Sequence, residues 1–399
     1  MRRTVAFVTL GCKLNYAETS SIEREFLAGG FEKVAQTAPA DVYVVNTCSV
    51  TEHSDKKDRN IIRRLHRQNP DARIIVTGCY AQLKPQEILN LEGVYAVLGA
   101  KDKGRAFEIA TEALKEGNSA YIEEDVDSSE SIFKAYSSGE RTRSFLKVQD
   151  GCDYHCTYCT VPLARGRSRN VSIAEIIAQA REIAAEGIKE IVLTGVTIGD
   201  FGRTTGESFL ELLRKLNEVE GIERYRISSI EPNLLTPEIV EWIASGTKFV
   251  PHFHIPLQSG CDKIALIRSK LENVFFGIDV IVGFPGETDE DFEQTYHFLE
   301  QVRPAFIHMF PYSCRANTPA AAMPDQVRDG IKTERVARLE ALCKELNDEF
   351  VEQNRGRSEK VLFESTLKGG MMVGYTSNYI RIERPFDRSL IGKMAEVII

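Results

Sequence analysis

Short apolar runs alternate with polar helical stretches through the first third of the chain. Three runs rich in β-branched residues predict buried strands: 5–10, 42–47 and 74–78. A stretch with helical spacing follows each of them: 19–28, 54–67 and 84–89. This β-α-β-α-β order predicts a parallel sheet with right-handed crossovers, in an α/β domain over residues 1–120.

The same alternation returns in the middle of the chain. Six strand-like runs are separated by helical patterns: 143–148, 190–195, 224–229, 252–256, 277–282 and 305–310. Six β-α units predict a six-stranded partial barrel, the core of a second domain over residues 138–355. Residues 261–275 make a poor helix between the fourth and fifth runs, so we expect that unit to be unusually short.

The last part of the chain changes character. Apolar residues at helical spacing predict one long amphipathic helix over 333–353, followed by a linker. Beyond the linker, residues 358–399 alternate apolar and polar positions between Gly and Tyr turns, which predicts a small β-barrel. The fold class is therefore α/β with a third, all-β domain.

Composition limits the location and the partners. The 399 residues carry a net charge of -8, so nucleic acid would have to be held by local basic patches. No apolar run approaches the ~20 residues that a membrane helix needs. Residues 1–10 mimic a signal peptide without its cleavage site, so we expect a first strand there. Nine cysteines in such a chain indicate a reducing compartment, and we expect a cytoplasmic protein that contacts no membrane.

One basic stretch stands out against this acidic background. Six basic side chains and one acidic side chain lie between Lys56 and Arg67, a balance of +5 on about three helical turns. The stretch is either an RNA-binding helix face or an ordinary solvated face. The sequence alone leaves both interpretations open.

Each of the three N-terminal strands ends in a cysteine: Cys12, Cys48 and Cys79. Residues beyond the carboxyl ends of parallel strands line one edge of the sheet, so the three thiols should converge. A single cysteine at such a place is usually a small buried hydrophobe. Three equivalent ones indicate a shared metal centre, either an iron–sulfur cluster or a zinc ion with His53 as fourth ligand.

A second group of cysteines follows the first strand of the predicted barrel. Cys152, Cys156 and Cys159 are spaced so that one loop wraps three thiolates around a single cluster. A cubane cluster has four irons, so three cysteines leave one iron open to a small molecule. A structural zinc knuckle is the alternative, with His155 or Cys261 as the fourth ligand.

This second trio, with Tyr158 just before its last cysteine, resembles the signature of the radical S-adenosylmethionine (SAM) superfamily. The resemblance implies that the open iron binds the methionine portion of SAM, which is cleaved to a deoxyadenosyl radical. Because the chemistry belongs to the cofactor, we assign no acid–base residue. The same resemblance implies that Tyr158 lies against the adenine of the cofactor. It also implies cofactor contacts at the ends of the barrel strands, from Gly195, Ser229, Glu231 and Gln258.

Residues 374–379 resemble part of the TRAM domain, an RNA-binding β-barrel. Basic residues outnumber acidic ones by only one over 358–399. RNA binding there would therefore depend on shape and on stacking by Tyr375 or Tyr379. The alternative is a domain that only packs against the rest of the chain.

Together the three parts resemble the radical SAM methylthiotransferases along nearly the whole chain. The resemblance implies two [4Fe-4S] clusters, with Cys12, Cys48 and Cys79 as ligands of an auxiliary one. In that family one SAM methylates a sulfur carried at the auxiliary cluster, and a second SAM yields the radical that activates a C–H bond. A tRNA substrate, a reducing electron donor and a sulfur source are the implied partners. Relatives carry a longer helix after the fourth barrel strand, so we expect residues to be missing near 268–273.

Within the family, residues 9–15 and 310–320 look most like the MtaB branch. That branch modifies N6-threonylcarbamoyladenosine next to the anticodon of tRNA. Ala316 and Asn317 depart from the glycine that the branch usually has there. The MiaB branch acts on isopentenyladenosine in tRNA and the RimO branch on a ribosomal protein aspartate, and both stay as alternatives.

Two other classes of protein remain open. One is a radical enzyme that uses the first cluster only for electron transfer, and the other is a zinc-stabilised RNA-binding protein. Arg165, Arg167 and Arg169 either grip tRNA phosphate or pair with acidic neighbours. Three further cysteines have no partner spacing and are expected to be packing residues: Cys261, Cys314 and Cys343.

Overall fold

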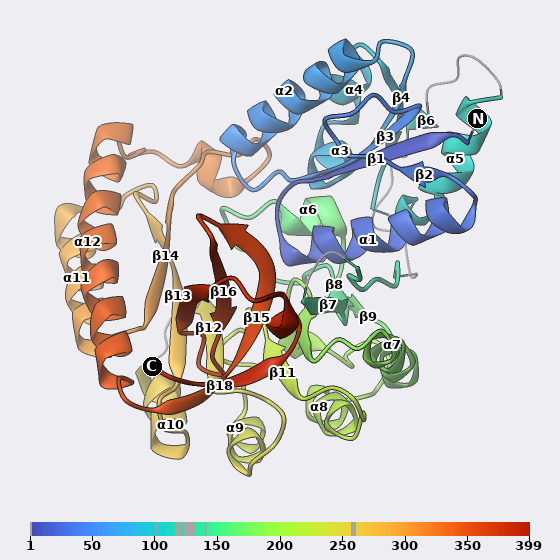
Figure 1. The fold of residues 1–399 in the computed structure, drawn as a ribbon. Helices are drawn as coiled ribbons and strands as arrows, with labels where there is room; N and C mark the ends of the chain where they lie inside the picture. Colours follow the sequence, from blue (N-terminus) through green and yellow to red (C-terminus); the bar gives the residue numbers. More distant parts are fainter. Residues whose placement is uncertain (1, 101, 116–120, 123–131, 140–141, 257–260) are drawn as a thin grey trace. The chain divides into compact units, whose positions relative to one another are not determined.

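A computed structural model describes the chain over residues 2–100, 102–115, 121–122, 132–139, 142–256 and 261–399 (Figure 1). These residues form two compact units. Unit 1 comprises residues 1–138, 145–171 and 313–321, and unit 2 comprises 139–144, 172–312 and 322–399. The second cysteine loop therefore belongs to the same unit as the N-terminal sheet.

Unit 1 is built on a parallel sheet with the strand order β2-β1-β3-β4-β5-β6. Three strands confirm the predicted runs: β1 (Thr4–Thr9), β3 (Val42–Thr47) and β4 (Arg73–Gly78). The pattern did not predict the other three: β2 (Glu32–Lys33), β5 (Val94–Leu98) and β6 (Tyr121–Ile122). β1 pairs with β3 and β3 with β4, all in parallel, so their carboxyl ends share one edge.

Five helices cover the two faces of this sheet: α1 (Lys13–Ala28), α2 (Glu52–Gln68), α3 (Cys79–Leu83), α4 (Pro85–Leu89) and α5 (Ala106–Ala113). α1 and α5 pack on one face, and α2, α3 and α4 pack on the other, over two separate apolar layers. Because both faces are covered, the strands are continuous apolar runs instead of alternating ones. α1 begins directly after Cys12, earlier than the predicted residue 19.

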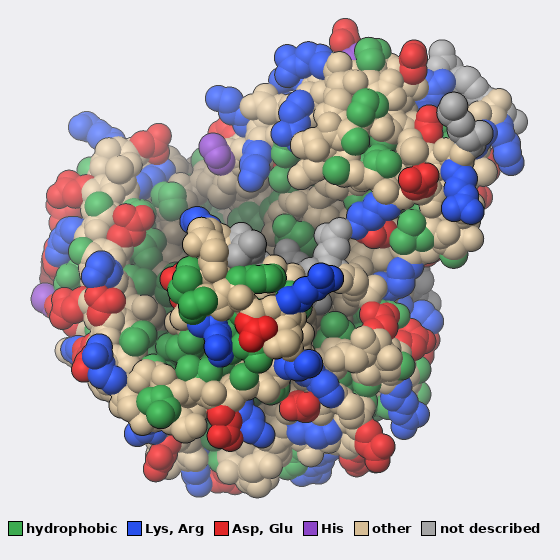
Figure 2. Space-filling view, in the orientation of Figure 1, with side chains coloured by type: hydrophobic (Ala, Val, Ile, Leu, Met, Phe, Trp, Pro, Cys, Tyr) green, Lys and Arg blue, Asp and Glu red, His purple; other side chains and the backbone are tan. Residues whose placement is uncertain are grey.

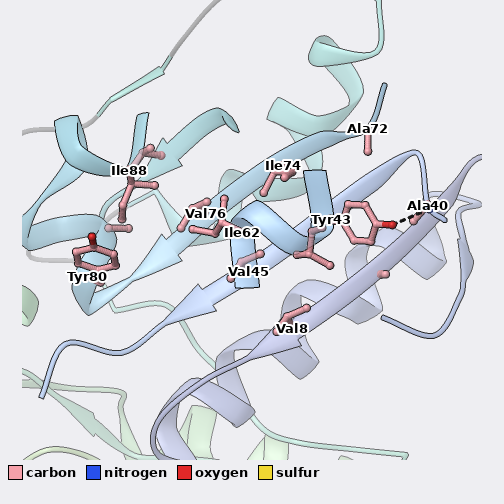
Figure 3. Close-up of a cluster of buried hydrophobic side chains, with 14 residues drawn as sticks. Val8, Ala40, Tyr43, Val45, Ile62, Ala72, Ile74, Val76, Tyr80 and Ile88 are labelled. Carbon is pink, nitrogen blue, oxygen red and sulfur yellow. Dashed lines mark hydrogen bonds between the residues drawn. The ribbon is translucent and has the colours of Figure 1, made fainter. Parts of the chain in front are cut away.

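Figure 3 shows the apolar layer under α2, α3 and α4. Val45 and Val76 of the sheet share this layer with Ile62 of α2, and all three side chains are fully buried. The Tyr43 hydroxyl is satisfied at the margin, since it accepts from the Ala40 N–H at 3.2 Å. Each such aliphatic side chain stabilises the fold by roughly 1.5–3 kcal/mol relative to an exposed one.

The rest of unit 1 carries the second cysteine loop. β8 (Gln149–Asp150) and β9 (Arg169–Asn170) pair in antiparallel fashion on either side of it. α6 (Val161–Arg165) follows the last cysteine of the loop. Two 3₁₀ turns complete the unit's regular structure: η1 (Lys103–Arg105) and the start of η3 (Pro319–Ala322).

Unit 2 contains the partial barrel, and its strands confirm five of the six predicted runs: β10 (Glu190–Thr194), β11 (Arg224–Ile227), β12 (His252–Pro256), β13 (Phe275–Val282) and β14 (Phe306–Pro311). β10 pairs with β11, and β12, β13 and β14 pair in order, all in parallel. A bridge between Ser229 and His254 joins the end of β11 to β12. The sixth run is β7 (Arg143–Lys147), whose residues are shared between the two units.

Five helices follow in unit 2: α7 (Ile173–Ala185), α8 (Phe209–Asn217), α9 (Pro237–Ala244), α10 (Cys261–Lys270) and α11 (Asp289–Val302). Residues 261–275, expected to be short for a helix and its return, contain the ten-residue α10. The connection is nevertheless short, since Asn273 turns the chain at a φ of 53° and β13 begins at Phe275. Across the described ranges, no helix has both the length and the apolarity to cross a bilayer.

The C-terminal part of unit 2 begins with α12 (Asp329–Gln353), which confirms the predicted long helix and packs on β14. An antiparallel sheet with the order β17-β16-β15-β18 follows. Its strands are β15 (Ser358–Lys368), β16 (Met371–Tyr375), β17 (Arg381–Pro385) and β18 (Met394–Ile398). The predicted small barrel is seen as a half-barrel. Two more 3₁₀ turns lie in unit 2: η2 (Ile198–Asp200) and η4 (Arg388–Leu390).

A buried ionic cluster, here called the Glu190 cluster, joins this sheet to the barrel strands. Its members are Glu190, Arg143, Arg224 and Arg226. Glu190 pairs with Arg224 and accepts from Arg226 Nε at 2.9 Å. Arg226 also donates to the carbonyls of Thr376 and Ser377, at 2.6 and 2.7 Å. The C-terminal sheet is thereby docked at the N-terminal ends of β10 and β11.

Candidate functional site

The structure brings the first cysteine trio together at one edge of the N-terminal sheet. Cys12 precedes α1, Cys48 follows β3 and Cys79 begins α3. Gly11 has a φ of 95° and approaches Cys48 so closely that an added Cβ would lie 2.9 Å from its sulfur. Only glycine fits that approach, and it holds the turn before Cys12 against Cys48.

Within this trio, burial and the neighbouring thiols disfavour the ionisation of Cys48. Burial, followed by the neighbouring thiol of Cys79 and then that of Cys12, raises the pKa of Cys48 to about 12. The Cys48 N–H donates to Asp58 Oδ2 at 3.0 Å, and burial raises the pKa of this carboxyl to about 7. Thiols in such surroundings become thiolates when a metal supplies positive charge. The trio is therefore suited to a metal centre.

The second trio lies on a loop whose backbone serves the sulfur atoms. The Cys159 N–H donates to the Cys156 carbonyl at 3.0 Å, which closes a tight turn. The N–H groups of Tyr154 and Val161 donate to the sulfurs of Cys152 and Cys159, each at 3.4 Å. Hydrogen bonds to sulfur favour the thiolate form, so the loop is prepared to hold a cation.

The two trios are neighbours within unit 1. Burial and the other two thiols of the loop raise the pKa of Cys159 to about 11, and the thiol of Cys79 contributes as well. α3, which begins at Cys79, packs against α6, which follows Cys159. The two groups of thiols therefore form one continuous site, which the sequence did not reveal.

The segment 313–321 contacts the loops of both trios. Arg315 Nη2 donates to Ser49 Oγ at 2.6 Å and pairs with Asp55 at 3.0 Å, beside the first trio. The Ala320 N–H donates to the Thr157 carbonyl at 2.9 Å, inside the second cysteine loop. The residues that suggested the MtaB branch thus include part of the cysteine site.

A second buried ionic cluster, here called the Arg165 cluster, adjoins this site: Glu18, Lys103, Lys147, Asp150 and Arg165. Arg165 Nη1 donates to Glu18 Oε1 at 3.0 Å and to Asp150 Oδ1 at 2.9 Å. Lys147 Nζ donates to the same two carboxylates, at 2.8 and 2.7 Å. Against the effect of burial, Arg165 and the two lysines hold the pKa of Glu18 well below its usual value. For Arg165, pairing with acidic neighbours is confirmed.

The other two arginines after the cysteine loop differ from each other. Arg169 is buried and donates to the carbonyls of Arg165 and Arg167, at 2.7 and 3.0 Å. The Arg167 side chain is 82% exposed and lies 3.8 Å from Asp153. Of these three arginines, only Arg167 therefore remains available to a phosphate.

Three of the residues expected to contact SAM lie at one edge of the barrel. Gly195 follows β10, and Ser229 and Glu231 follow the neighbouring β11. Among the described residues, Glu231 Oε2 is buried without a hydrogen-bond partner. Burial, with a contribution from Asp200, raises the pKa of Glu231 to about 7. A polar ligand that donates to this carboxylate would satisfy it.

The other predicted SAM contacts and the three unpaired cysteines have different outcomes. Tyr158 is half-buried within the cysteine loop of unit 1. Gln258 lies outside the described residues, as does the side chain of Cys261. Cys343 is buried against Ile307 as expected, but the packing prediction is wrong for Cys314, which is exposed because the segment 313–321 turns it outward.

Three polar side chains that could bind a metal ion, on β12, β13 and β14, were not predicted from the sequence. Ligand atoms of His254, Asp279 and His308 lie within 4.8 Å of one another, on β12, β13 and β14. His254 Nε2 lies 2.6 Å from Asp279 Oδ1, and its Nδ1 lies 3.1 Å from Ser229 Oγ. A signal was present, since each residue is a polar interruption of an apolar strand.

The outer side of α2 carries exposed basic residues, here called the α2 basic face: Lys56, Lys57, Arg63, Arg64 and Arg67. Figure 2 shows Lys and Arg side chains along this helix. Arg59 is set apart, because it pairs with Glu87 at 2.8 Å. Ile62 and Leu65 on the opposite side pack on the sheet, so the helix presents its positive charge outward.

The two tyrosines expected to stack on RNA are engaged within unit 2. The rings of Tyr375 and Tyr379 stack on each other with centroids 4.8 Å apart. The Arg143 guanidinium lies 4.8 Å from the centroid of Tyr375, and that of Arg226 lies 4.9 Å from Tyr379. These contacts support the alternative in which the tyrosines dock the C-terminal sheet.

Two family descriptions match the chain. Residues 4–99 match an uncharacterized protein family, UPF0004, and residues 146–299 match the radical SAM superfamily. The first match covers the sheet with Cys12, Cys48 and Cys79. The second begins just before the second cysteine loop and ends in α11.

Curated proteins match almost the whole chain. Threonylcarbamoyladenosine tRNA methylthiotransferase MtaB of Bacillus subtilis is 40% identical, over 99% of this chain and 93% of the relative. The MtaB protein of Aquifex aeolicus is 36% identical over 99% and 100%. A tRNA-2-methylthio-N(6)-dimethylallyladenosine synthase of Hydrogenobaculum sp. is 30% identical over 98% and 95%.

A solved structure shares the fold. The radical SAM methyltransferase TsrM from Kitasatospora setae, with cobalamin and a [4Fe-4S] cluster bound, matches with a TM-score of 0.58. The match covers 80% of this chain and 77% of that one at 16% identity, so it bears on the fold alone. On the evidence of the full-length relatives, the chain belongs to the radical SAM methylthiotransferase family, in its MtaB branch.

Proposed function

We propose that this protein attaches a methylthio group to N6-threonylcarbamoyladenosine beside the anticodon of tRNA. The observation that carries the proposal is the pair of adjacent cysteine trios in unit 1. A radical enzyme that needs one cluster leaves the first trio unexplained, whereas methylthio transfer requires both a radical and a sulfur carrier. The relatives with the same full-length organisation carry this activity in their names.

The cysteines would hold two [4Fe-4S] clusters, with Cys12, Cys48 and Cys79 as ligands of one, and Cys152, Cys156 and Cys159 as ligands of the other. Three thiolates from each trio would leave one iron of a four-iron cluster open to a small molecule. Such a cluster supplies an electron for SAM cleavage and a place for sulfur when bound.

SAM would lie at the carboxyl ends of the barrel strands. Glu231 would accept hydrogen bonds from hydroxyl groups of the cofactor, because its buried oxygen has no other donor among the described residues. Gly195 would let the cofactor approach the backbone after β10, and Ser229 would face it beside His254. Tyr158 and Gln258 complete the proposed set, the former against the adenine.

The tRNA would be held through its phosphates by the α2 basic face. Five exposed cations on one helix provide local attraction that the net charge of -8 does not. The C-terminal half-barrel, which we propose to be TRAM-like, would add shape recognition. An electron donor and a sulfur source complete the reaction, and its tRNA substrate places it in the cytoplasm.

Mass spectrometry of tRNA nucleosides tests the function directly. Cells that lack the gene should lose only the methylthio form of threonylcarbamoyladenosine, and the full chain should restore it. Loss of the methylthio form of isopentenyladenosine instead would favour the MiaB-type alternative. An unchanged profile would remove the proposal.

The purified protein tests the two clusters. Anaerobic reconstitution should give about eight irons per chain, and Cys48→Ser and Cys156→Ser should each lower the iron content by up to half. Cys48→Ser should still cleave SAM but transfer no methylthio group, whereas Cys156→Ser should do neither. Zinc in place of iron would favour the RNA-binding alternative, and SAM cleavage by the wild type with no transfer to any tRNA would favour the electron-transfer alternative.

A further inference from the structure

The Arg165 cluster ties together chain segments that carry both cysteine trios. Arg165 ends α6, which follows Cys159, and Asp150 lies just before Cys152. Glu18 lies on α1, which begins directly after Cys12. The hydrogen bonds from Arg165 to these two carboxylates, at 3.0 and 2.9 Å, therefore connect the second loop with the first trio.

A second chain of hydrogen bonds leads from Arg165 to the turns of the first trio. Arg165 Nη2 donates to Asn15 Oδ1 at 2.7 Å. Asn15 Nδ2 donates in turn to the carbonyls of Leu10 and Thr47, at 2.7 and 3.0 Å. These carbonyls lie in the two strand ends that lead into Cys12 and Cys48. One guanidinium thus reaches the backbone of both turns through a single asparagine.

The cluster is almost completely removed from water. Its five side-chain residues are at most 3% exposed. Three cations face two carboxylates, which leaves one positive charge in excess. The two carboxylates are therefore shared between the cations, and Arg165 and Lys147 each donate to both of them. Against the effect of burial, the carboxylates of Glu18 and Asp150, followed by Cys79 and Cys12, raise the pKa of Arg165 well above its usual value.

Stability alone gives no reason for this arrangement. Apolar residues of similar volume often replace a buried ionic network at no loss of stability. What such a network provides is direction, because each donor must meet its acceptor at a fixed distance and angle. The guanidinium is the side chain best suited to this, with five donors in a rigid plane.

We propose that Arg165 is a positioning residue that fixes the separation and orientation of the second cysteine trio relative to the first. This inference rests on the proposed function. In that function, the radical generated at one trio activates a substrate atom, and the sulfur held at the other trio must lie within reach of the same atom. If this connection is loosened, each trio still holds its iron and SAM is still cleaved. Fewer of the cleavage events then lead to transfer of a methylthio group.

The test compares Arg165→Lys with Arg181→Lys in the anaerobically reconstituted full chain. Lysine keeps the charge but cannot reach Glu18, Asp150 and Asn15 together. Arg181 is an exposed arginine of α7, outside the segments that carry the cysteines, and serves as the control. With tRNA that contains threonylcarbamoyladenosine, we measure iron content, deoxyadenosine formed and methylthio nucleoside formed.

Arg165→Lys should retain its iron and form at least about tenfold more deoxyadenosine per methylthio group transferred, since a misplacement of about 1 Å can cost about 100-fold in rate. Arg181→Lys should match the wild type. If the ratio of the two products stays the same in Arg165→Lys, the inference is overturned. If this variant loses iron, Asn15→Ala decides, because it removes the link from Arg165 to Leu10 and Thr47, along with a 3.9 Å contact to the Cys12 sulfur, and leaves the ion pairs of Arg165 in place: a raised ratio supports the inference and an unchanged ratio overturns it.

Pulsed electron paramagnetic resonance of the doubly reduced protein gives a readout that needs no tRNA. The distribution of distances between the two paramagnetic centres should be narrow in the wild type and in Arg181→Lys, and broader in Arg165→Lys. Equal widths overturn the inference. Because this experiment does not depend on transfer to tRNA, it tests positioning even if the proposed function fails.

Discussion

The Arg165 cluster of unit 1 and the Glu190 cluster of unit 2 are built from the same chemistry but have different surroundings. Each buries several basic groups around fewer carboxylates. In the Glu190 cluster the extra donors meet backbone carbonyls of Thr376 and Ser377 and the faces of tyrosine rings. In the Arg165 cluster they meet Asn15, and the excess charge faces the thiols.

This difference separates a structural role from a positioning role. The partners of the Glu190 cluster are all protein groups that a folded chain supplies, so the cluster is fully explained by docking of the C-terminal sheet. The Arg165 cluster also has protein partners, but they connect two segments that carry cysteines. Only a buried polar group whose partners the fold does not supply points to a ligand or a metal.

Glu231 extends the comparison to a third case. Its buried Oε2 faces no donor among the described residues, and its pKa is raised to about 7 by burial. Here the negative charge is in excess. By the same reasoning, its partner is expected to be the cofactor.

The largest effect is expected from Glu190→Gln, which leaves the buried Arg224 and Arg226 without their carboxylate. Breaking a buried pair by removal of one partner typically costs about 3–5 kcal/mol. Urea denaturation of the apoprotein should show a loss of this size, and limited proteolysis should release the C-terminal sheet. Glu364→Gln is the control, because Glu364 pairs with Arg143 at a more exposed position and should cost about 1 kcal/mol or less. A loss below about 1 kcal/mol for Glu190→Gln would mean that docking does not depend on the cluster.

The pH dependence of stability should identify the same carboxylate. Despite burial, Arg226, Arg224 and Arg143 lower the pKa of Glu190 from 4.5 to about 2. A carboxyl whose pKa is lowered by folding stabilises the folded state at pH values above its pKa in the unfolded chain. This contribution is lost as the pH falls from 4.5 through 2. The shift corresponds to about 3 kcal/mol. Apoprotein stability should fall by about that much more in the wild type than in Glu190→Gln over this range, and parallel curves would contradict the assignment.

Glu231→Gln should weaken SAM binding in a pH-dependent way. The wild-type carboxylate ionises as the pH rises through its pKa of about 7, and only the ionised form is a charged acceptor for cofactor hydroxyls. A charged hydrogen bond is worth about 1.5–3 kcal/mol, which is tenfold or more in affinity. Calorimetry should therefore give a ratio of dissociation constants, variant to wild type, near one at about pH 6 and about ten at about pH 8. A ratio that does not change with pH would place the cofactor elsewhere.

The sequence predicted those parts of the site that depend on local pattern. The strand runs indicated which cysteines lie at a common edge, and the spacing of Cys152, Cys156 and Cys159 marked a cluster loop. A β-α repeat carries this information within about 30 residues. The same locality explains why five of the barrel strands were found within a residue or two of their observed bounds.

The remaining parts depend on contacts between distant residues. Arg165 and Glu18 are 147 positions apart, and Arg226 and Thr376 are 150 apart, so no periodicity connects them. The sequence left Arg165 open between a phosphate ligand and a partner of acidic residues, because an arginine in a loop has no visible partner in the sequence. It left Tyr379 open between RNA stacking and packing for the same reason, and its face is taken by Arg226. Partners of buried polar groups are set by the tertiary fold, so local pattern could not decide between these alternatives.

Exposed charge should behave unlike either buried cluster, and the α2 basic face gives the smallest predicted effect. Lys57→Gln combined with Arg64→Gln should change stability by no more than about 0.5 kcal/mol, since both side chains are on the surface. Binding of tRNA should weaken by about tenfold at low salt. The slope of log affinity against log salt should fall by about 0.9 for each phosphate that the helix no longer neutralises.

The control for this variant removes two other exposed lysines, Lys215 of α8 and Lys344 of α12, and therefore changes the net charge equally. Electrophoretic mobility shift at several salt concentrations distinguishes local binding from a general effect of charge. If both double variants weaken tRNA binding alike, the attraction is diffuse and α2 has no special place in it. If only the α2 variant weakens tRNA binding, the helix that begins just beyond Cys48 holds tRNA. Tyr379→Ala should instead lower stability before it affects tRNA binding, because it removes a ring that packs inside unit 2.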